Sequence, residues 1–177
     1  KDNISQDKLA VLVYSAIGKL SDQSEISPLL VTIKDNISQD KLAELASKAI
    51  DKISSNWTIS HLFDYIKDNI SQNKLAELAS KAIDKMDPSD ISQWGARHNS
   101  YSPIPIKDTD SHISHILVTI KDKISQDKLD ELATTAIEKM SIDRTIIYLL
   151  ESIKDNISQN TLAELVSSAI GKFSEQD

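Results

Sequence analysis

The chain has 177 residues, of which 40% are hydrophobic and 5% aromatic, with a net charge of -7 and no cysteine. The lack of cysteine excludes disulfides and thiolate metal sites, and a negative charge without any Lys- or Arg-rich run argues against phosphate-backbone binding as the main activity. No apolar stretch approaches the roughly 18 residues of a membrane-spanning helix. Since aromatic residues are few, we expect an interior of Leu, Ile and Ala.

One phrase of twenty residues occurs five times along the chain. The copies start at Lys1, Lys34, Lys67, Lys121 and Lys154, so the spacings are 33, 33, 54 and 33 residues. A fixed period in this range is typical of stacked supersecondary units. We therefore predict a single solenoid over 1–177, with repeats 1–33, 34–66, 67–120 and 121–153, a partial repeat 154–177, and an insert at 87–107. Because the chain opens inside the first copy, we expect it to be a piece of a longer protein.

Residues 34–66 serve as the type repeat, and their first half predicts an amphipathic helix of about 15 residues. Ser38 is the expected N-cap, because its hydroxyl can accept from a free amide of the first turn. The apolar stripe of this helix comprises Leu42, Leu45, Ala46, Ala49, Ile50 and Ile53. A retained Lys, Lys52 in this repeat, falls in the last turn, where a cation suits the helix dipole.

The second half of the repeat predicts a shorter helix of about ten residues. Its stripe is Ile59, Leu62, Phe63 and Ile66, with Thr58 or a neighbour as the cap. Asn tolerates the left-handed conformation that ends many helices, so we expect Asn36, Asn69 and Asn156 to stop the second helix in this way. Lys123 replaces this Asn once, and we expect that junction to be strained or irregular.

A lone helix pair cannot bury its apolar stripe, whereas stacked neighbours can. The expected fold is all-α, a right-handed superhelical solenoid of stacked antiparallel helix pairs. The chain resembles the broad class of two-helix solenoid repeats. The sequence signatures of tetratricopeptide and ankyrin repeats are absent from it.

Variation among the repeats concentrates in the turn between the two helices and on one side of the second helix. Stacking brings equivalent positions side by side, so these residues form a variable ribbon along one edge. Its candidate partner-binding residues are Trp57, His61, Tyr65, His115, Arg144 and Tyr148. Such side chains are enriched among interface anchors. The alternative is that these exposed turn residues vary because nothing constrains them.

The insert opens with Asp87 and Pro88, a good helix start. Trp94, Arg97, His98 and Tyr101 then recur at spacings of three and four, which predicts one face of a short helix. Insertions in repeat arrays often lie on the binding face, so these four residues are further partner-binding candidates. The alternative is a decorative loop whose Trp94 packs on the solenoid.

A weak metal signal follows the insert. Asp108 and Asp110 precede His112 and His115, and such residues could gather a zinc ion. The known helical His motifs use a spacing of four, however, and Asp110 or Ser111 is more simply the cap of the helix that resumes at Ser111. We therefore expect no metal, cofactor or catalytic residue, and no enzyme, since no nucleophile motif or Gly-rich phosphate loop is present.

The leading hypothesis is a protein- or peptide-binding scaffold, for which we expect a microbial origin and a secreted or surface location. Alternatives are a nucleic-acid-binding array, an acidic nucleic-acid mimic, and a metal protein centred on His98, His112 and His115. In the first repeat, Val11, Val13 and Tyr14 replace Glu, Ala and Ser. A terminal repeat should be more polar than an internal one, so self-association through these three residues is expected.

Overall fold

The computed structural model describes residues 4–86 and 108–174, which form nine α-helices and no strand. The first helices of the repeats, here called A helices, are α1 (Gln6–Lys19), α3 (Gln39–Lys52), α5 (Gln72–Lys85), α8 (Gln126–Lys139) and α10 (Gln159–Ser174). The second, or B, helices are α2 (Ile26–Ile33), α4 (Asn56–Ile66), α7 (Asp108–Ile120) and α9 (Asp143–Ile153). Short 3-10 turns, η1 (Gln23–Glu25) and η2 (Lys34–Asn36), flank α2.

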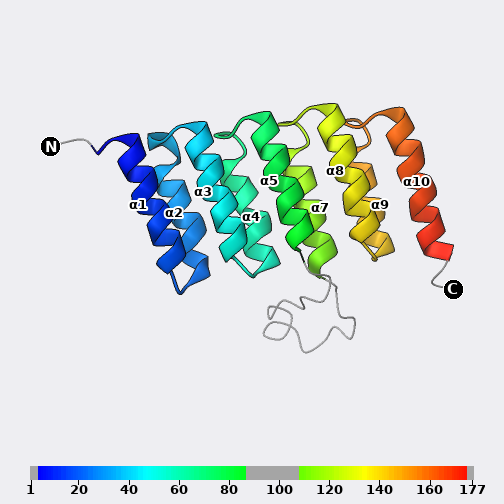
Figure 1. Ribbon diagram of the computed structural model, residues 1–177. Coiled ribbons are helices and arrows are strands. Elements are labelled where there is room, and N and C mark those ends of the chain that lie inside the picture. The colour runs from blue at the N-terminus through cyan, green and yellow to red at the C-terminus, as the bar shows by residue number, and fades with distance from the viewer. Residues whose placement is uncertain (1–3, 87–107, 175–177) are drawn as a thin grey trace.

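The helices form two layers that run the length of the molecule (Figure 1). In one layer α1, α3, α5, α8 and α10 pack in this order, and in the other α2, α4, α7 and α9 do so. Helices α5 and α8 are neighbours, so the period continues across the insert. The expected all-α class and the sequential packing of helix pairs are confirmed. No described helix has the length and hydrophobicity that a membrane span requires.

The core lies between the layers and consists of the predicted stripes. All six stripe residues of α3 and its cap, Leu42 to Ile53, are buried, and the four of α4 are at most 1% exposed. The same positions are buried in α5 and α8. Complete burial of a Leu or Ile stabilises by roughly 1.5–3 kcal/mol, so these side chains dominate the stability of each junction.

The predicted Ser residue precedes each A helix. Three of these hydroxyls accept a first-turn amide, Ser5 from Lys8 at 3.3 Å, Ser38 from Lys41 at 3.4 Å and Ser158 from Thr161 at 3.1 Å. Ser71 and Ser125 have the same extended backbone but make no such side-chain bond. The Ser therefore marks the start of the helix in every repeat, while its capping bond forms in some of them.

The expectation of left-handed Asn residues is wrong, because no described residue other than glycine has a positive φ. The chain instead turns through 3-10-type bonds, such as the one from Asn69 N to Ile66 O at 2.9 Å. The side chain of Asn69 donates to Asp35 Oδ1 of the preceding repeat at 3.2 Å, and Asn156 donates to Asp122 Oδ1 at 2.8 Å. The Asn thus links one repeat to the next.

The junction at Lys123 is regular, which corrects the expectation of strain there. Its backbone makes the same turn, from Lys123 N to Ile120 O at 2.8 Å. The Lys123 ammonium lies 2.6 Å from Asp68 Oδ1, so an ion pair replaces the Asn–Asp bond. The hydrogen bond from Lys123 to Asp68 holds the pKa of Asp68 below its ordinary value and raises the pKa of Lys123.

The retained Lys of the last turn also joins neighbouring repeats. Lys85 Nζ donates to the carbonyls of Ile50 and Asp51 at the end of the preceding A helix. Lys139 and Lys172 make equivalent bonds to the helix ends before them. Partial burial lowers the pKa of Lys85, and the nearby charge of Asp51 opposes this effect. The Lys therefore satisfies the free carbonyls of another helix end, beyond its effect on its own dipole.

The N-caps predicted for two B helices, α4 and α7, are both wrong. Helix α4 begins at Asn56, and Ser55 is its cap, accepting from Thr58 N at 3.3 Å. Helix α7 begins at Asp108, so Asp110 and Ser111 lie inside it. Asp110 is 1% exposed, and its Oδ2 accepts from Ser141 N at 2.7 Å and Ile142 N at 2.6 Å. Its carboxylate therefore holds the α8–α9 turn of the next repeat.

Candidate functional site at the α4–α7 junction

One side of α4 carries large side chains that the core does not use. Trp57, His61 and Tyr65 follow one another at four-residue spacing, so they share one helix face. Trp57 and Tyr65 are each 46% exposed, whereas Ile59 and Leu62 on the other side are fully buried. The neighbouring helix α7 presents His115 at the register position of His61.

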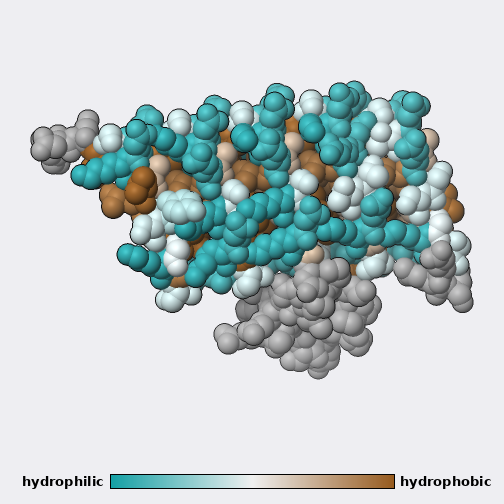
Figure 2. All heavy atoms as spheres, viewed as in Figure 1, coloured by the Kyte–Doolittle hydropathy of each residue, from teal (hydrophilic) through white to brown (hydrophobic). Residues whose placement is uncertain are grey.

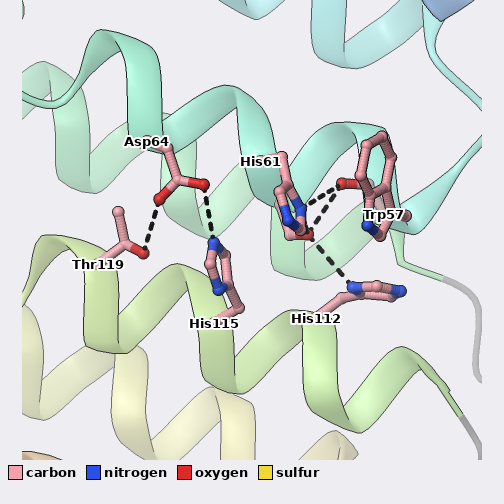
Figure 3. A network of polar contacts seen from close by, with 7 residues as sticks. Trp57, His61, Asp64, His112, His115 and Thr119 are labelled. Carbon is pink, nitrogen blue, oxygen red and sulfur yellow. Dashed lines mark hydrogen bonds and ion pairs between the residues drawn. The ribbon is translucent and has the colours of Figure 1, made fainter.

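Three of these rings form a stacked column that crosses from α4 to α7 (Figure 3). The ring centroids of Trp57 and His61 are 4.4 Å apart, with 26° between the planes. Those of His61 and His115 are 4.7 Å apart, with only 10° between the planes. Equivalent positions of two repeats thus meet face to face, as expected from the register.

The hydrogen bonds of His61 fix which of its nitrogens is free to accept. Its Nδ1 lies 3.0 Å from the carbonyl oxygen of Trp57 and 3.2 Å from Ser60 Oγ. Since a carbonyl only accepts, Nδ1 carries the proton and Nε2 has the lone pair. The ring is also held in place by its stack on Trp57. His61 is therefore an oriented imidazole with an accepting Nε2.

Asp64, one turn further along α4, connects the column to α7 (Figure 3). Its Oδ2 lies 3.1 Å from His115 Nε2, and its Oδ1 accepts from Thr119 Oγ1 at 3.3 Å. The side chains of His115 and Asp64 are 36% and 34% exposed. The pair is therefore accessible to solvent and to ligands.

A buried polar contact lies deeper in the same junction. The Ser60 hydroxyl donates to Trp57 O at 3.0 Å, so its oxygen is left to accept from His112 Nδ1 at 3.2 Å. Ser60 is fully buried and His112 is 5% exposed. Beside the column, Asn56 Nδ2 donates to Thr109 Oγ1 at 3.1 Å. These contacts hold α4 and α7 in register beneath the exposed rings.

The junction brings together groups that can hold a metal ion. One ligand atom from each of His61, Asp64 and His115 lies within 4.8 Å of the others. Three residues considered from the sequence for such a site have described side chains, Asp110, His112 and His115; of these His115 belongs to the cluster, while Asp110 and His112 make the buried contacts above. Asp64 and Thr119 were not among the residues predicted for the site, although Asp64 follows His61 by three residues on the same helix.

The other predicted partner-binding residues lie along the same layer or outside the described residues. Arg144 and Tyr148 share one face of α9, where Tyr148 is 55% exposed. Arg144 stands in the register of Trp57, and Tyr148 in that of His61 and His115. The insert candidates Trp94, Arg97, His98 and Tyr101 fall outside the described ranges.

The first repeat leaves an apolar face uncovered, but its composition differs from the expectation. Val13 is 5% exposed and belongs to the core, so it offers little surface to another copy. Val11 is 68% exposed, and the Lys48 ammonium lies 3.3 Å from the ring centroid of the half-exposed Tyr14. Leu12 is 51% exposed, whereas its register partner Leu45 is 2% exposed.

Figure 2 shows the A layer, where hydrophilic side chains lie in bands and hydrophobic ones are visible between the bands and at the two ends. A groove of about 930 Å³ runs across α1, α3 and α5. Four of its charged side chains are paired within the groove, Lys81 with Asp51 at 2.7 Å and Lys74 with Glu77 at 2.7 Å. Because these groups already have partners, the groove offers less unpaired chemistry than the α4–α7 junction.

No protein-family model matches the chain, and no curated protein matches it at a significant level.

Proposed function

We propose that the chain is a non-enzymatic repeat scaffold that binds a protein or peptide partner through its variable ribbon. The supporting observation is that large exposed side chains occupy the positions that the repeats do not keep. Trp57, Tyr65 and Tyr148 are 46%, 46% and 55% exposed. The retained positions of the same helices are buried, so the exposed rings contribute little to the fold.

The chemistry of the variable ribbon suits a macromolecular partner. Trp, Tyr and Arg are enriched among residues that carry most of the binding energy at interfaces. Stacking already restricts Trp57 and His61, so ordering these rings on binding costs less conformational entropy. A long layer of stacked helices, here proposed to be a right-handed superhelical solenoid, gives an extended surface of this kind.

The charge of the ribbon favours a protein over a nucleic acid. Among its described candidate residues Arg144 is the one permanent cation, and Asp64 and Glu151 lie beside the rings at one register position. Affinity for a phosphate backbone depends on clustered cations. A protein or peptide with apolar and basic side chains fits this surface better than DNA or RNA.

Selection from a peptide library, with the full chain immobilised, tests the proposal. Affinities of selected peptides are then compared between the wild type and W57A/Y148A. Truncating an anchor at an interface costs about 2 kcal/mol or more, about 30-fold in Kd. The matched control E44A/E131A removes two exposed acids from the A layer and should leave Kd unchanged. Peptides that keep their affinity for W57A/Y148A but lose it for E44A/E131A would place the binding surface on the other layer.

The insert 87–107 is proposed as a second contact element, through Trp94, Arg97, His98 and Tyr101. Removal of the insert should weaken the partners that W57A/Y148A also weakens. Partner recovery that is unchanged without the insert would exclude it as a contact element, while the variable ribbon would remain testable by its own variant.

Self-association through the first repeat is a separate proposal, now restricted to Val11, Leu12 and Tyr14. Sedimentation velocity over a range of concentrations should show reversible association of the wild type that Leu12→Glu weakens. Thr134→Glu adds a charge at an exposed position of α8 and serves as the control. A wild type that stays monomeric at every concentration would refute this proposal.

A further inference from the structure

We infer that His61, Asp64 and His115 form a binding site for one divalent transition-metal ion, with zinc as the best fit. The three ligand atoms lie within 4.8 Å of one another, and they come from two helices that the core holds together. In a tetrahedral zinc site, bonds of 2.0–2.2 Å place ligand atoms roughly 3.4 Å apart. An inward movement of these side chains, together with a turn of one histidine ring, reaches the required geometry.

The donor set matches the preferences of zinc. Imidazole nitrogens and a carboxylate oxygen are ordinary zinc ligands, and three protein ligands leave a fourth position for water or another donor. Hard cations such as Mg²⁺ prefer oxygen ligands, so a set with two imidazoles selects against them. All three residues are partly exposed, which gives an ion and a fourth donor access from solvent.

His61 has the supporting contact that a metal-binding histidine needs. Such a histidine almost always donates its other ring N–H to a carbonyl, carboxylate or water, which fixes its tautomer and orientation. His61 Nδ1 makes this bond to Trp57 O at 3.0 Å, so Nε2 is the ligand atom. Asp64 has an equivalent support, because Thr119 donates to its Oδ1 and leaves Oδ2 for the ion.

One ring must turn for the ion to bind. A metal lies in the plane of each imidazole that ligates it, and the rings of His61 and His115 are nearly parallel and 4.7 Å apart. Both planes cannot contain one ion in that arrangement. His61 is fixed by its hydrogen bond to Trp57 O, whereas His115, apart from its stack on His61, contacts Asp64 Oδ2, which is itself a ligand. His115 is therefore the ring that turns, about a torsion that is intrinsically broad.

Binding therefore exchanges the His61–His115 stack for two bonds to the metal. This exchange distinguishes a specific site from adventitious binding by scattered histidines, because it changes the environment of one ring in a defined way. The site goes beyond partner binding by the variable ribbon, and it is tested with the protein alone, so either proposal can fail while the other stands.

The experiment uses the full chain, freed of metal by a chelator, and titrated with Zn²⁺ by calorimetry and with Co²⁺ by absorption. We expect one ion per chain and the intense visible bands of four-coordinate Co²⁺. Loss of a supporting residue of a metal site costs about 10–100-fold in affinity. His115→Gln, Asp64→Asn and His61→Gln should therefore each lose about 100-fold or more, and Thr119→Val about 10-fold.

Two controls separate this site from general histidine binding. His98→Gln removes a histidine that the proposed site does not use, and Glu151→Gln changes the acid at the register of Asp64 on α9; both should retain the wild-type affinity. Circular dichroism melting of every variant shows whether it remains folded. Equal losses for His98→Gln and His115→Gln, weak octahedral Co²⁺ bands, or unchanged affinity in folded Asp64→Asn would each overturn the proposal.

Discussion

Asp110 and Asp64 lie at neighbouring junctions of the B layer and are used in opposite ways. Asp110 faces the α8–α9 turn, is 1% exposed, and accepts two backbone N–H groups. Asp64 faces α7, has a side chain that is 34% exposed, and meets the side chains of His115 and Thr119. The Asp110 carboxylate accepts hydrogen bonds from the backbone of the next repeat, whereas the Asp64 carboxylate contacts side chains, which can change rotamer.

The register shows which of these roles belongs to the fold. At the position of Asp110 the first repeat has Gln23, whose Oε1 accepts from Ser54 N at 2.7 Å. An acceptor toward the next turn therefore recurs while its chemical type changes. At the position of Asp64 two other repeats carry Val31 and Val118 and a third carries Glu151, so the fold does not require an acceptor there. An acid that the repeat does not need is the better candidate for binding.

The largest expected difference between the two acids is in stability. Asp110→Ala leaves two partly buried amides without their charged acceptor, which should lower the free energy of unfolding by about 2–4 kcal/mol. Asp64→Ala removes half-exposed contacts and should cost less than about 1 kcal/mol. Urea denaturation followed by circular dichroism measures both. The contrast fails if Asp64→Ala costs as much as Asp110→Ala.

A second, smaller effect should appear in the ring column. His115→Ala removes one stacked ring and the imidazole partner of Asp64, so it should cost about 0.5–1.5 kcal/mol. In a Trp94→Phe background, Trp57 is the one indole, and its NMR signals report the change through His61. Thr119→Val, which keeps the stack, is the control and should leave the Trp57 signals nearly unchanged. Identical spectra for His115→Ala and its background would show that the column does not form in solution.

The sequence predicted most of the helical frame, because the frame is set by local periodicity. The stripe from Leu42 to Ile53 and the Ser start of each A helix recur in every copy, so spacing alone places them. The contacts between repeats were missed. The contacts of Asn69 with Asp35 and of Lys85 with Ile50 span more than thirty positions. The local pattern instead gave Asn69 and Lys85 a role at the end of their own helix.

The candidate site was predicted in part for a related reason. Equivalent positions meet when repeats stack, so His61 and His115 belonged on one ribbon with Trp57. The contact between Asp64 and His115 links different register positions across the insert, and its geometry depends on ring orientations that spacing does not give. Asp110 was assigned to its own helix start because an Asp near a predicted boundary is a frequent cap. In the structure it is buried and accepts hydrogen bonds from the backbone of the next repeat instead.

The smallest predicted effect concerns the polar contact that joins each repeat to the one before it, in which Lys123 once replaces Asn. The pKa of Asp68 lies below its ordinary value of 3.8, because Lys123 donates a hydrogen bond to it. A carboxylate with a lowered folded pKa contributes stability that is fully present above its unfolded pKa and lost as pH falls through the folded one. Lys123→Asn restores the amide–carboxylate bond of the Asn69 and Asn156 junctions, so it should reduce the loss of melting temperature below about pH 4 while leaving the melting temperature at pH 7 nearly unchanged. Asp68→Asn should show the same reduced acid sensitivity, and steeper acid unfolding in either variant would contradict the assignment of this ion pair.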